Sequence, residues 1–388
     1  MSREPSSVSP LCPGDLAADS EIAAVASSYR FLLAVSPVNL DSARRAFTAG
    51  EPVEFEYRPR PEGLDELRDR LNTVDISACE NSIVQTLLQQ RVREIELELD
   101  MLDARDTPDF LKLSLERFGG VSPRLLDEAV DLLENIDNPA PSKGRVNAEE
   151  FAAEVVDEIE RYRQDDPDFD VEISIDPEVG SLTVSEGAIH IPAATSIPRN
   201  RVKALIQHEI GTHVLSYVNG SRQPVRLLAA GLAGYEETQE GLAVFTEYLV
   251  GGLTARRMRT LAARVVAVDS LVGGAKLPEC HETLSGFGLS SHSAFGITAR
   301  VYRSGGLTKD ALYLQGLLNV IEYVRSGGSL ERLWVGKVSL DSFSLVEDLL
   351  DARILRAPAL VPRLLETPES KARIDRCSTE FRLRELVQ

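Results

Sequence analysis

The sequence predicts a predominantly helical α+β protein that carries one small β-sheet near its middle. Three observations predict this fold class. Apolar residues recur at steps of three and four over long stretches, which is the period of a buried helix face. Short segments that alternate apolar and polar residues gather between residues 171 and 191, as expected for a few half-buried strands. At 388 residues the chain is long enough to bury a large core and to form two or three domains.

The N-terminal third is expected to be helical after a disordered start. Residues 1–19 are rich in Ser and Pro and are predicted to be disordered. Residues 20–143 are predicted to form a mainly helical region, which ends in the Pro-rich stretch 137–143. The elements expected before that stretch are helices at 19–35, 39–47, 81–103 and 122–136, and a half-buried strand at 53–57.

Residues 144–388 are expected to form a further domain that begins with the sheet. Asn147 and Glu150 have the pattern of a capping box for a helix that reaches Tyr162. A strand at 171–175 precedes a hairpin around Glu186-Gly187. The hairpin strands are 182–184 and 189–191, and helices are predicted at 202–218, 238–249, 291–303 and 308–323, with two or three more after them.

The helix at 202–218 carries two of the five histidines, His208 and His213, with Glu209 directly after the first. A histidine pair with an adjacent glutamate on a helix is typical of a catalytic zinc site. The usual offset of four residues places both histidines on one helix face. Here the offset is five, which turns the side chains roughly 140° apart on an ideal helix. A one-residue π-type bulge would realign them, and Gly211 lowers the resistance to that distortion.

A catalytic zinc needs a third protein ligand and an open position for water. The best candidate lies in the segment 235–243, where Thr238 is predicted to cap a helix. Glu240 then lies in the first helical turn, where the helix dipole stabilises an ionised carboxylate. Glu236 and Glu247 lie four residues before and seven after Glu240 on the same face, and are candidates for hydrogen-bond partners of the ligands.

The two motifs together carry a family resemblance. HEIGTH at 208–213, followed by QEGLA at 239–243, resembles the family named for its QEGLA motif, whose animal members are the microtubule-associated tyrosine carboxypeptidases. The resemblance extends from about residue 25 to past residue 320. It implies that residues 144–388 form a zincin-like metallopeptidase domain, with the small sheet beside the active-site helix.

The resemblance also implies the roles of the motif residues. In that family the two histidines and the glutamate of the second motif hold zinc, and the glutamate after the first histidine is the catalytic base. Carried over to this sequence, His208, His213 and Glu240 are the ligands of one Zn2+ per chain, and Glu209 is the base. The expected activity is that of a zinc-dependent carboxypeptidase that releases a C-terminal Tyr or Phe from a peptide or protein.

A carboxypeptidase must bind the free C-terminal carboxylate of its substrate, and a guanidinium with two parallel donors suits this task best. Arg300 and Arg303 are the candidates, and Lys309 is the next choice; a surface ion pair is an equal alternative for each. Tyr302 and His292 are candidates for a second donor to the oxyanion that forms during hydrolysis.

Two further predictions concern the substrate cleft. In zincin-type peptidases a sheet edge beside the active-site helix often holds the substrate backbone, and the resemblance suggests Ala188–Ile191 for this role by strand addition. An ordinary hairpin packed on the core is the alternative. Phe287, Phe295 and Tyr313 are candidates for the lining of an apolar pocket, although core packing explains them equally well.

Composition limits the partners and the compartment. The chain has 42 basic and 61 acidic residues, and its net charge of −19 argues against nucleic acid and anionic membranes as partners. The four cysteines are scattered without a C-x-x-C pair, which fits a reducing compartment. No signal peptide is recognised, and no apolar run approaches the ~20 residues that a membrane span requires. We therefore expect a cytoplasmic protein whose partner is a peptide or protein C-terminus.

Two other functions are compatible with parts of the pattern. A metal-binding regulatory protein without peptidase activity is the main alternative, but such a protein would not need Glu209 as a base. A carboxylate-bridged di-metal protein would use Glu236, Glu237 and Glu240. That design requires paired Glu-x-x-His motifs on facing helices, and neither Glu236 nor Glu237 is followed by histidine three residues later. Glu236, Glu237 and Glu247 remain alternatives to Glu240 as the third ligand.

Overall fold

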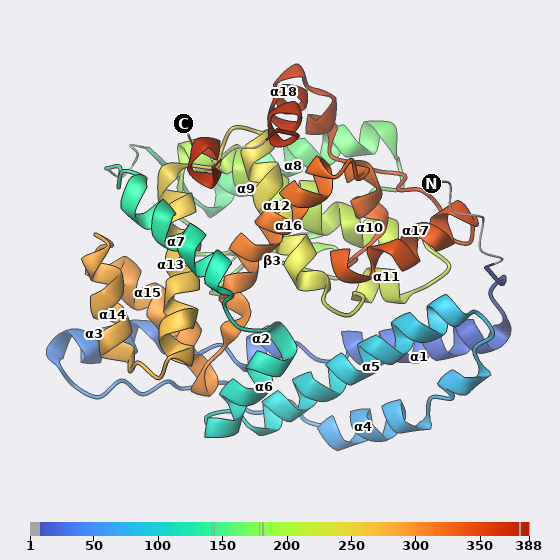
Figure 1. Cartoon of the computed structure of the whole chain (residues 1–388), viewed down its shortest axis with the longest axis horizontal. Helices are drawn as coiled ribbons and strands as arrows, with labels where there is room; N and C mark the ends of the chain where they lie inside the picture. The colour runs from blue at the N-terminus through green and yellow to red at the C-terminus, as the bar shows by residue number, and fades with distance from the viewer. Residues whose placement is uncertain are drawn as a thin grey trace.

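Helices dominate the structure, a computed structural model that describes residues 8–140, 142, 144–177, 179–180, 182–379 and 382–387 (Figure 1). The strands of this described part form one three-stranded sheet and one two-stranded ribbon. The predicted fold class, a predominantly helical α+β protein with a small sheet, is therefore confirmed.

The N-terminal helices are α1 (Pro13–Ser27), α2 (Phe31–Ala34), α3 (Leu40–Ala49), α4 (Leu64–Thr73), α5 (Ser82–Asp103), α6 (Pro108–Phe118) and α7 (Pro123–Asn135). The helices predicted at 39–47, 81–103 and 122–136 are present, the one predicted at 19–35 is divided into α1 and α2, and α4 and α6 are not among the predicted helices. The side chain of Asn81 caps α5 by accepting hydrogen bonds from two backbone N–H groups of its first turn. Ser122 caps α7 in the same way, and Pro123 occupies the first helical position, as predicted.

The prediction that residues 1–19 are disordered is wrong for the end of this segment, because α1 already begins at Pro13. The Cys12 thiol accepts a hydrogen bond from the Asp15 N–H, and the Asp15 carboxylate accepts one from the Cys12 N–H. This capping box uses cysteine, which is not among the preferred capping residues, so the sequence pattern does not indicate the start of the helix. Residues 1–7 lie outside the described residues.

The predicted strand at 53–57 is also wrong. It has no strand partner among the described residues, apart from a single bridge between Pro37 and Tyr57. Val53 and Phe55 instead pack against a small buried cluster that consists of Ala43, Phe295 and Ala299. The alternation of apolar residues therefore reflects packing of an extended loop onto a helix, and not pairing in a sheet.

The small sheet lies where it was expected, but the order of its strands contradicts the predicted role of Ala188–Ile191 in substrate binding. Its strands are β2 (Ile173–Asp176), β3 (Thr183–Ser185) and β4 (Ala188–Pro192), in the order β2-β4-β3. β4 pairs with β2 in parallel and with β3 in antiparallel fashion. Because β4 is central, its backbone has no free edge, and the prediction that Ala188–Ile191 binds substrate by strand addition is wrong. The free edge beside the active-site helix belongs to β3.

The remaining elements surround one long helical segment made of α9 (Val202–His208), the π-helix η3 (Glu209–Val214) and α10 (Leu215–Ser221). Before it come the ribbon strands β1 (Arg145–Val146) and β5 (Ile197–Pro198), and between them α8 (Ala148–Asp165), which has the predicted capping box. After it come α11 (Leu227–Ala230), α12 (Tyr235–Leu249), α13 (Ala255–Val272), α14 (Leu277–Gly286), α15 (Ser291–Tyr302), α16 (Leu312–Arg325), α17 (Phe343–Asp351) and α18 (Pro368–Cys377).

Helix α12 begins earlier than predicted. Its N-cap is Gly234, whose φ of 72° is favourable only for glycine, and Thr238 lies inside the helix. The Thr238 hydroxyl accepts a hydrogen bond from the N–H of Leu340, a residue that is far away in sequence. The prediction of Thr238 as N-cap is therefore wrong, because its polar side chain serves a tertiary contact.

One connected apolar core includes side chains from both predicted regions, for example Leu99 and Phe110 from the first and Leu227 and Phe245 from the second. Helix α7 packs along α13, and α1 contacts α11 (Figure 1). The N-terminal helices thus help to hold the elements that carry the site. The division at residue 143 into two domains stays a prediction.

Helix α12 is placed by its crossing with α16, where two glycines meet. A Cβ atom built on Gly241 would lie 2.1 Å from the carbonyl carbon of Gly316. No side chain fits at this distance, so only a Gly–Gly contact allows the two backbones to approach this closely. This explains in physical terms why glycine follows Glu240 in the second motif.

We expect Gly241→Ala to lower the free energy of unfolding by about 3 kcal/mol, at the upper end of the cost of overpacking, because the backbones of α12 and α16 must separate. Chemical denaturation measures this change. Gly296→Ala in α15 is the matched control, since a Cβ atom added there would meet no neighbouring atom within 4 Å and alanine favours a helix. Equal stabilities of the two variants would contradict the close crossing.

Candidate metal centre

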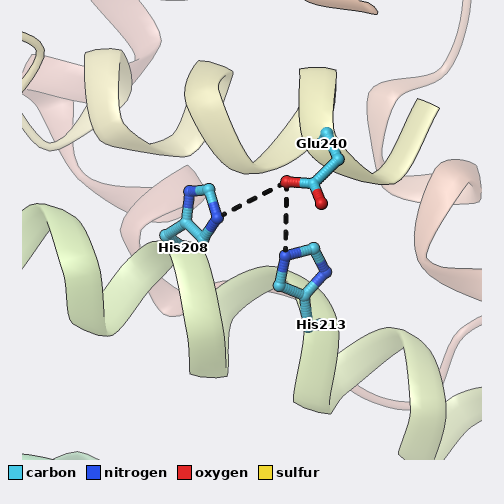
Figure 2. Close-up of side chains that lie close together, drawn as sticks. All are labelled: His208, His213 and Glu240. Carbon is cyan, nitrogen blue, oxygen red and sulfur yellow. Dashed lines mark ion pairs between the residues drawn. The ribbon is translucent and has the colours of Figure 1, made fainter. Parts of the chain in front are cut away.

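The π-helix predicted from the histidine spacing is confirmed, because η3 spans Glu209–Val214 and contains His213. The wider turn brings His208 and His213 to the same side of the helix, with ring centroids 5.1 Å apart (Figure 2). Gly211 leaves room for the Gln207 side chain, since a Cβ atom at this position would lie 2.6 Å from the Gln207 Oε1 atom. The indole N–H of Trp334 donates to the Gly211 carbonyl at 2.7 Å and helps to fix the turn.

Glu240 reaches both histidines from the neighbouring helix α12 (Figure 2). Its Oε2 atom lies 3.7 Å from the His208 Nε2 atom and 4.0 Å from the His213 Nε2 atom. The three side chains offer ligand atoms that all lie within 4.8 Å of one another. Glu240 Oε2 is buried and has no hydrogen-bond partner in the part of the chain that the structure describes.

These residues fit a zinc ion. A buried carboxylate oxygen without a hydrogen bond costs free energy unless a cation compensates it. Two imidazole nitrogens and one carboxylate oxygen are a donor set of catalytic zinc sites, which leave the fourth position to water. Burial lowers the pKa of His213 to about 4, so this imidazole is neutral, the form that binds metal ions. His208, His213 and Glu240 would therefore hold the ion.

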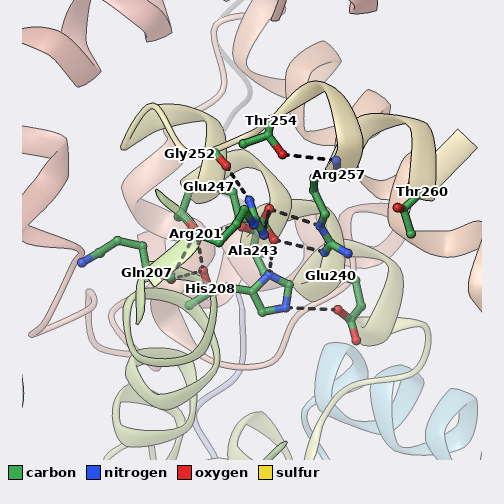
Figure 3. Close-up of polar contacts among 12 residues, drawn as sticks. Arg201, Gln207, His208, Glu240, Ala243, Glu247, Gly252, Thr254, Arg257 and Thr260 are labelled. Carbon is green, nitrogen blue, oxygen red and sulfur yellow. Dashed lines mark hydrogen bonds and ion pairs between the residues drawn. The ribbon is translucent and has the colours of Figure 1, made fainter. Parts of the chain in front are cut away.

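A second layer of polar contacts orients His208 (Figure 3). Its Nδ1 atom lies 2.9 Å from the Oε1 atom of Glu247, a fully buried carboxylate. A carboxylate only accepts, so the His208 Nδ1 carries the proton and the Nε2 lone pair faces Glu240. Glu247 is held in turn by the guanidinium groups of Arg201 and Arg257. The predicted contact between Glu247 and a candidate ligand is confirmed.

The charge of Glu247 is stabilised despite its complete burial. Burial alone would raise the pKa of Glu247, but Arg257, the hydrogen bond to His208, and Arg201 keep it well below its usual range. The site therefore contains a permanent negative charge behind His208. This charge increases the electron density on the imidazole and its affinity for a metal ion.

We expect Glu247→Gln to weaken zinc binding by about 10- to 100-fold, because the amide provides no charge behind His208. Competition with a chromophoric chelator measures the dissociation constant. Glu237→Gln on the same helix is the control, since Glu237 accepts a hydrogen bond from Asn319 and does not contact a ligand. If both variants bound zinc equally tightly, the role of Glu247 would be disproved.

Glu209 directly follows His208, is close enough to Glu240 for the two charges to interact, and is 8% exposed. Burial raises its pKa to about 7 although His208 lowers it, so in the metal-free chain this carboxyl titrates near neutral pH. Its carboxylate accepts no hydrogen bond from the described residues, which leaves both oxygens available to a water molecule. A base with these properties is suited to proton transfer at neutral pH.

Lys309 and Tyr313 approach Glu240 from the beginning of α16. The Lys309 Nζ atom lies 3.5 Å from the Glu240 Oε1 atom, on the side away from the histidines. Burial would raise the pKa of Glu240, but Lys309, both histidines and a hydrogen bond from Tyr313 lower it. From the sequence, Lys309 is the second choice for binding the substrate carboxylate, with an ion pair as the equal alternative, and the structure pairs it with Glu240. Tyr313 is expected only as an apolar residue, and sequence reasoning misses its polar contact.

The other predicted substrate-binding residues are engaged elsewhere. Arg300 forms two hydrogen bonds with the carboxylate of Asp310, at 2.8 and 2.9 Å. Arg303 donates to the Ser36 hydroxyl from a position that is 7% exposed. The Tyr302 hydroxyl donates to the Ala275 carbonyl, and the exposed His292 ring contacts Arg44. No contact between described residues joins any of these four side chains to the three candidate ligands.

The predicted aromatic pocket is not assembled either. Phe295 is buried in the small apolar cluster with Ala43 and packs against Phe47 at 5.3 Å between ring centroids. Phe287 is partly buried and packs on the main core. Core packing, the alternative interpretation, therefore explains both side chains, and only Tyr313 lies beside Glu240.

The N-terminal region reaches the site through a buried ionic network. Arg117 of α6 binds both carboxylate oxygens of Glu236, one turn before Glu240 on α12. It also pairs with Glu94 and Glu98 of α5, so that α5, α6 and α12 are joined. Glu236 and Glu94 approach Arg117 from different helices, a contact that sequence spacing does not reveal.

Together, the fold and the site define a helical protein with a candidate three-ligand metal centre and an adjacent carboxylate. The family model of the microtubule-associated tyrosine carboxypeptidases matches residues 46–381, and the chain belongs to this family. Membership implies a carboxypeptidase-like function on a peptide or protein. The match confirms the resemblance recognised from the two motifs and extends it over most of the last sixty residues.

No curated protein matches the sequence. None of the described helices is long and apolar enough to cross a membrane.

Proposed function

We propose that this protein is a zinc-dependent metallocarboxypeptidase that releases a C-terminal Tyr or Phe from a peptide or protein. The observation that carries the proposal is the convergence of His208, His213 and Glu240 around a buried, unpaired carboxylate oxygen, with Glu209 beside them. Family membership supports the carboxypeptidase reaction and a peptide or protein substrate.

Each residue has a defined task in this reaction. A zinc ion in the site would supply Lewis acidity, which lowers the pKa of water from about 15.7 to about 7 and polarises a carbonyl group. Glu209 takes the proton of the attacking water and passes it to the nitrogen of the leaving amino acid. Glu247 keeps the His208 imidazole in the tautomer that leaves Nε2 free. The products are the shortened peptide with a new carboxylate and the free C-terminal amino acid.

The alternative, a metal-binding regulator without peptidase activity, receives less support. A structural zinc site is closed by four protein ligands. The group of possible ligands among the described residues has three members, His208, His213 and Glu240, which is one fewer than a closed structural site needs. The Glu209 carboxylate accepts no hydrogen bond from the described residues, and a purely structural site gains nothing from such a carboxylate. A general base, in contrast, must have a free carboxylate oxygen to accept a proton.

The physical setting of the reaction is proposed from charge and cysteine chemistry. All four cysteines are free, and we place the protein in the cytoplasm, where thiols stay reduced. The net charge of −19 disfavours nucleic acid and anionic membranes as partners.

A peptide library with mixed C-termini tests the proposal. Mass spectrometry of the products is expected to show loss of one C-terminal residue, fastest for Tyr and Phe. The same peptides with amidated C-termini should remain intact. Removal of zinc with a chelator should abolish the release, and added zinc should restore it. Internal cleavage, or no release by the zinc-loaded protein, would contradict the proposal.

A further inference from the structure

A group of cationic side chains surrounds Tyr313 next to the candidate metal centre. Arg257 and Arg264 of α13 lie over the Tyr313 ring, with their guanidinium carbons 6.0 and 4.7 Å from its centroid, and Lys309 Nζ lies 5.7 Å from it. Arg300 and Arg303 are close enough to affect the charge of this group. The buried anions that face these cations are Glu240, Glu247 and Asp310.

Most of these cations are already committed to an anion. Arg257 donates to both oxygens of Glu247, and Lys309 pairs with Glu240. Arg300 occupies both oxygens of Asp310. Asp310 lies near Arg264 as well, but the hydrogen bonds that its carboxylate accepts from described guanidinium groups come from Arg300.

Arg264 has no such partner. Its Nε and Nη1 atoms are buried, and neither finds an acceptor in the part of the chain that the structure describes. Buried donors without acceptors are destabilising, and more so on a charged group. Burial and the nearby Arg300 both lower the pKa of Arg264, which reflects the same cost. A site that tolerates this cost is prepared for an anion.

The position of Arg264 suits the end of a substrate. Its guanidinium lies over the ring of Tyr313, and so does the ammonium group of Lys309, which pairs with Glu240. In a carboxypeptidase the terminal carboxylate follows the scissile carbonyl by one residue, about 3.5 Å of chain. Arg264 is separated from the candidate ligand Glu240 by the ring of Tyr313. At this position its guanidinium can reach that carboxylate with a hydrogen bond of about 2.9 Å.

We propose that Arg264, supported by Tyr313, forms a binding site for the free α-carboxylate of a peptide C-terminus. This inference rests on the proposed function and names the residue that selects a chain end over an internal peptide bond. The planar guanidinium presents parallel N–H donors to the two carboxylate oxygens. The Tyr313 ring holds it in place by a cation–π contact, and Arg257 and Arg300 stay with their own anions.

Two other cations suit this role less well than Arg264. Arg303 also has a buried Nε atom without an acceptor among the described residues, but its Nη1 atom donates to the Ser36 hydroxyl, and its guanidinium does not lie over the Tyr313 ring. Lys337 lies between the rings of Tyr217 and Tyr235, at 5.5 and 5.7 Å. An ammonium group in that position provides a point charge without the paired donors that a carboxylate matches.

Kinetics of peptide hydrolysis test the site. We expect Arg264→Met to lower kcat/KM by at least 100-fold, mainly through a higher KM, with unchanged zinc content. Arg264→Lys keeps the charge and should recover part of the loss. Arg256→Met, an exposed arginine on the same helix, is the control and should behave like the wild type. An Arg264→Met variant with kcat/KM within twofold of the wild type would overturn the proposal.

Binding of a simple ligand separates this inference from the proposed function. Calorimetry compares N-acetyl-phenylalanine with its C-terminal amide on the zinc-loaded wild type. We expect the acid to bind at least tenfold more tightly, and Arg264→Met to remove this preference. If the wild type hydrolysed no peptide but showed the preference, the carboxylate site would stand and the peptidase would be refuted. Equal binding of acid and amide by the wild type, or loss of the preference in Lys337→Met but not in Arg264→Met, would overturn the site.

Discussion

Replacement of Glu209 by glutamine should lower kcat for peptide hydrolysis by about 1,000-fold while zinc stays bound. General base catalysis by a positioned side chain contributes about 10²- to 10⁴-fold to a rate, and an amide cannot accept the proton of water. The carboxylate of Glu209 accepts no hydrogen bond from the described residues, so its replacement breaks no protein contact of that kind. Single-turnover measurements with a peptide ending in Phe, together with zinc analysis of the same sample, give both quantities.

Glu116→Gln is the control for this experiment. Glu116 lies on α6, away from the metal centre, and the same chemical change there should leave both rate and zinc content unaltered. A Glu209→Gln enzyme with a normal rate would remove Glu209 from its role as base. A variant that lost its zinc together with its activity would instead make Glu209 a ligand.

Replacement of Glu240 by alanine should lower the affinity for zinc by more than 100-fold. This effect exceeds the 10- to 100-fold loss of affinity that follows when a hydrogen-bond partner of a metal ligand is removed. Two causes add: one ligand is lost, and Lys309 loses its counter-charge. The ammonium group then repels a divalent cation in the same pocket. Competition with a chelator of known affinity measures the change.

Glu237→Ala on the same helix is the matched control and should bind zinc normally. Full zinc occupancy in Glu240→Ala would show that another glutamate of α12 is the third ligand. The structure makes this outcome unexpected, because each of the other glutamates already has a partner. Glu236 binds Arg117, and Glu237 binds Asn319. Glu247 binds the Nδ1 atom of His208.

The centre of the site can be predicted from the sequence because its geometry is local. An offset of five between His208 and His213 excludes an ideal helix face, and Gly211 between them indicates where the bulge forms. The long helices are predictable for the same reason, since Asn81 and Ser122 are capping residues that act within three positions.

The features that sequence reasoning misses depend on contacts between distant segments. Thr238 resembles an N-cap in sequence, but its hydroxyl serves Leu340. The alternation at 53–57 resembles a strand, but Phe55 packs against an apolar cluster that includes Phe295 and Ala299 of α15, far later in the chain. β4 is central in its sheet only because β2 pairs with it from the far side. Spacing along the chain does not encode such partners.

The substrate-binding arginines illustrate the same limit. Arg300 and Arg303 are candidates because of their spacing at one helix end, and Asp310 and Ser36 occupy them in the structure. Arg264 resembles a solvated basic residue in the sequence, since four arginines stand close together between residues 256 and 264. Only the three-dimensional arrangement distinguishes the unpaired guanidinium from Arg259, which donates to backbone carbonyl groups.

The zinc content of the purified protein tests the central claim most directly. Protein equilibrated with zinc and dialysed should contain one zinc ion per chain by mass spectrometry of the metal. A variant with both His208 and His213 replaced by alanine should contain none under the same conditions. A wild-type protein without zinc, or a double variant with the same zinc content as the wild type, would contradict a metal centre built on these two histidines and Glu240.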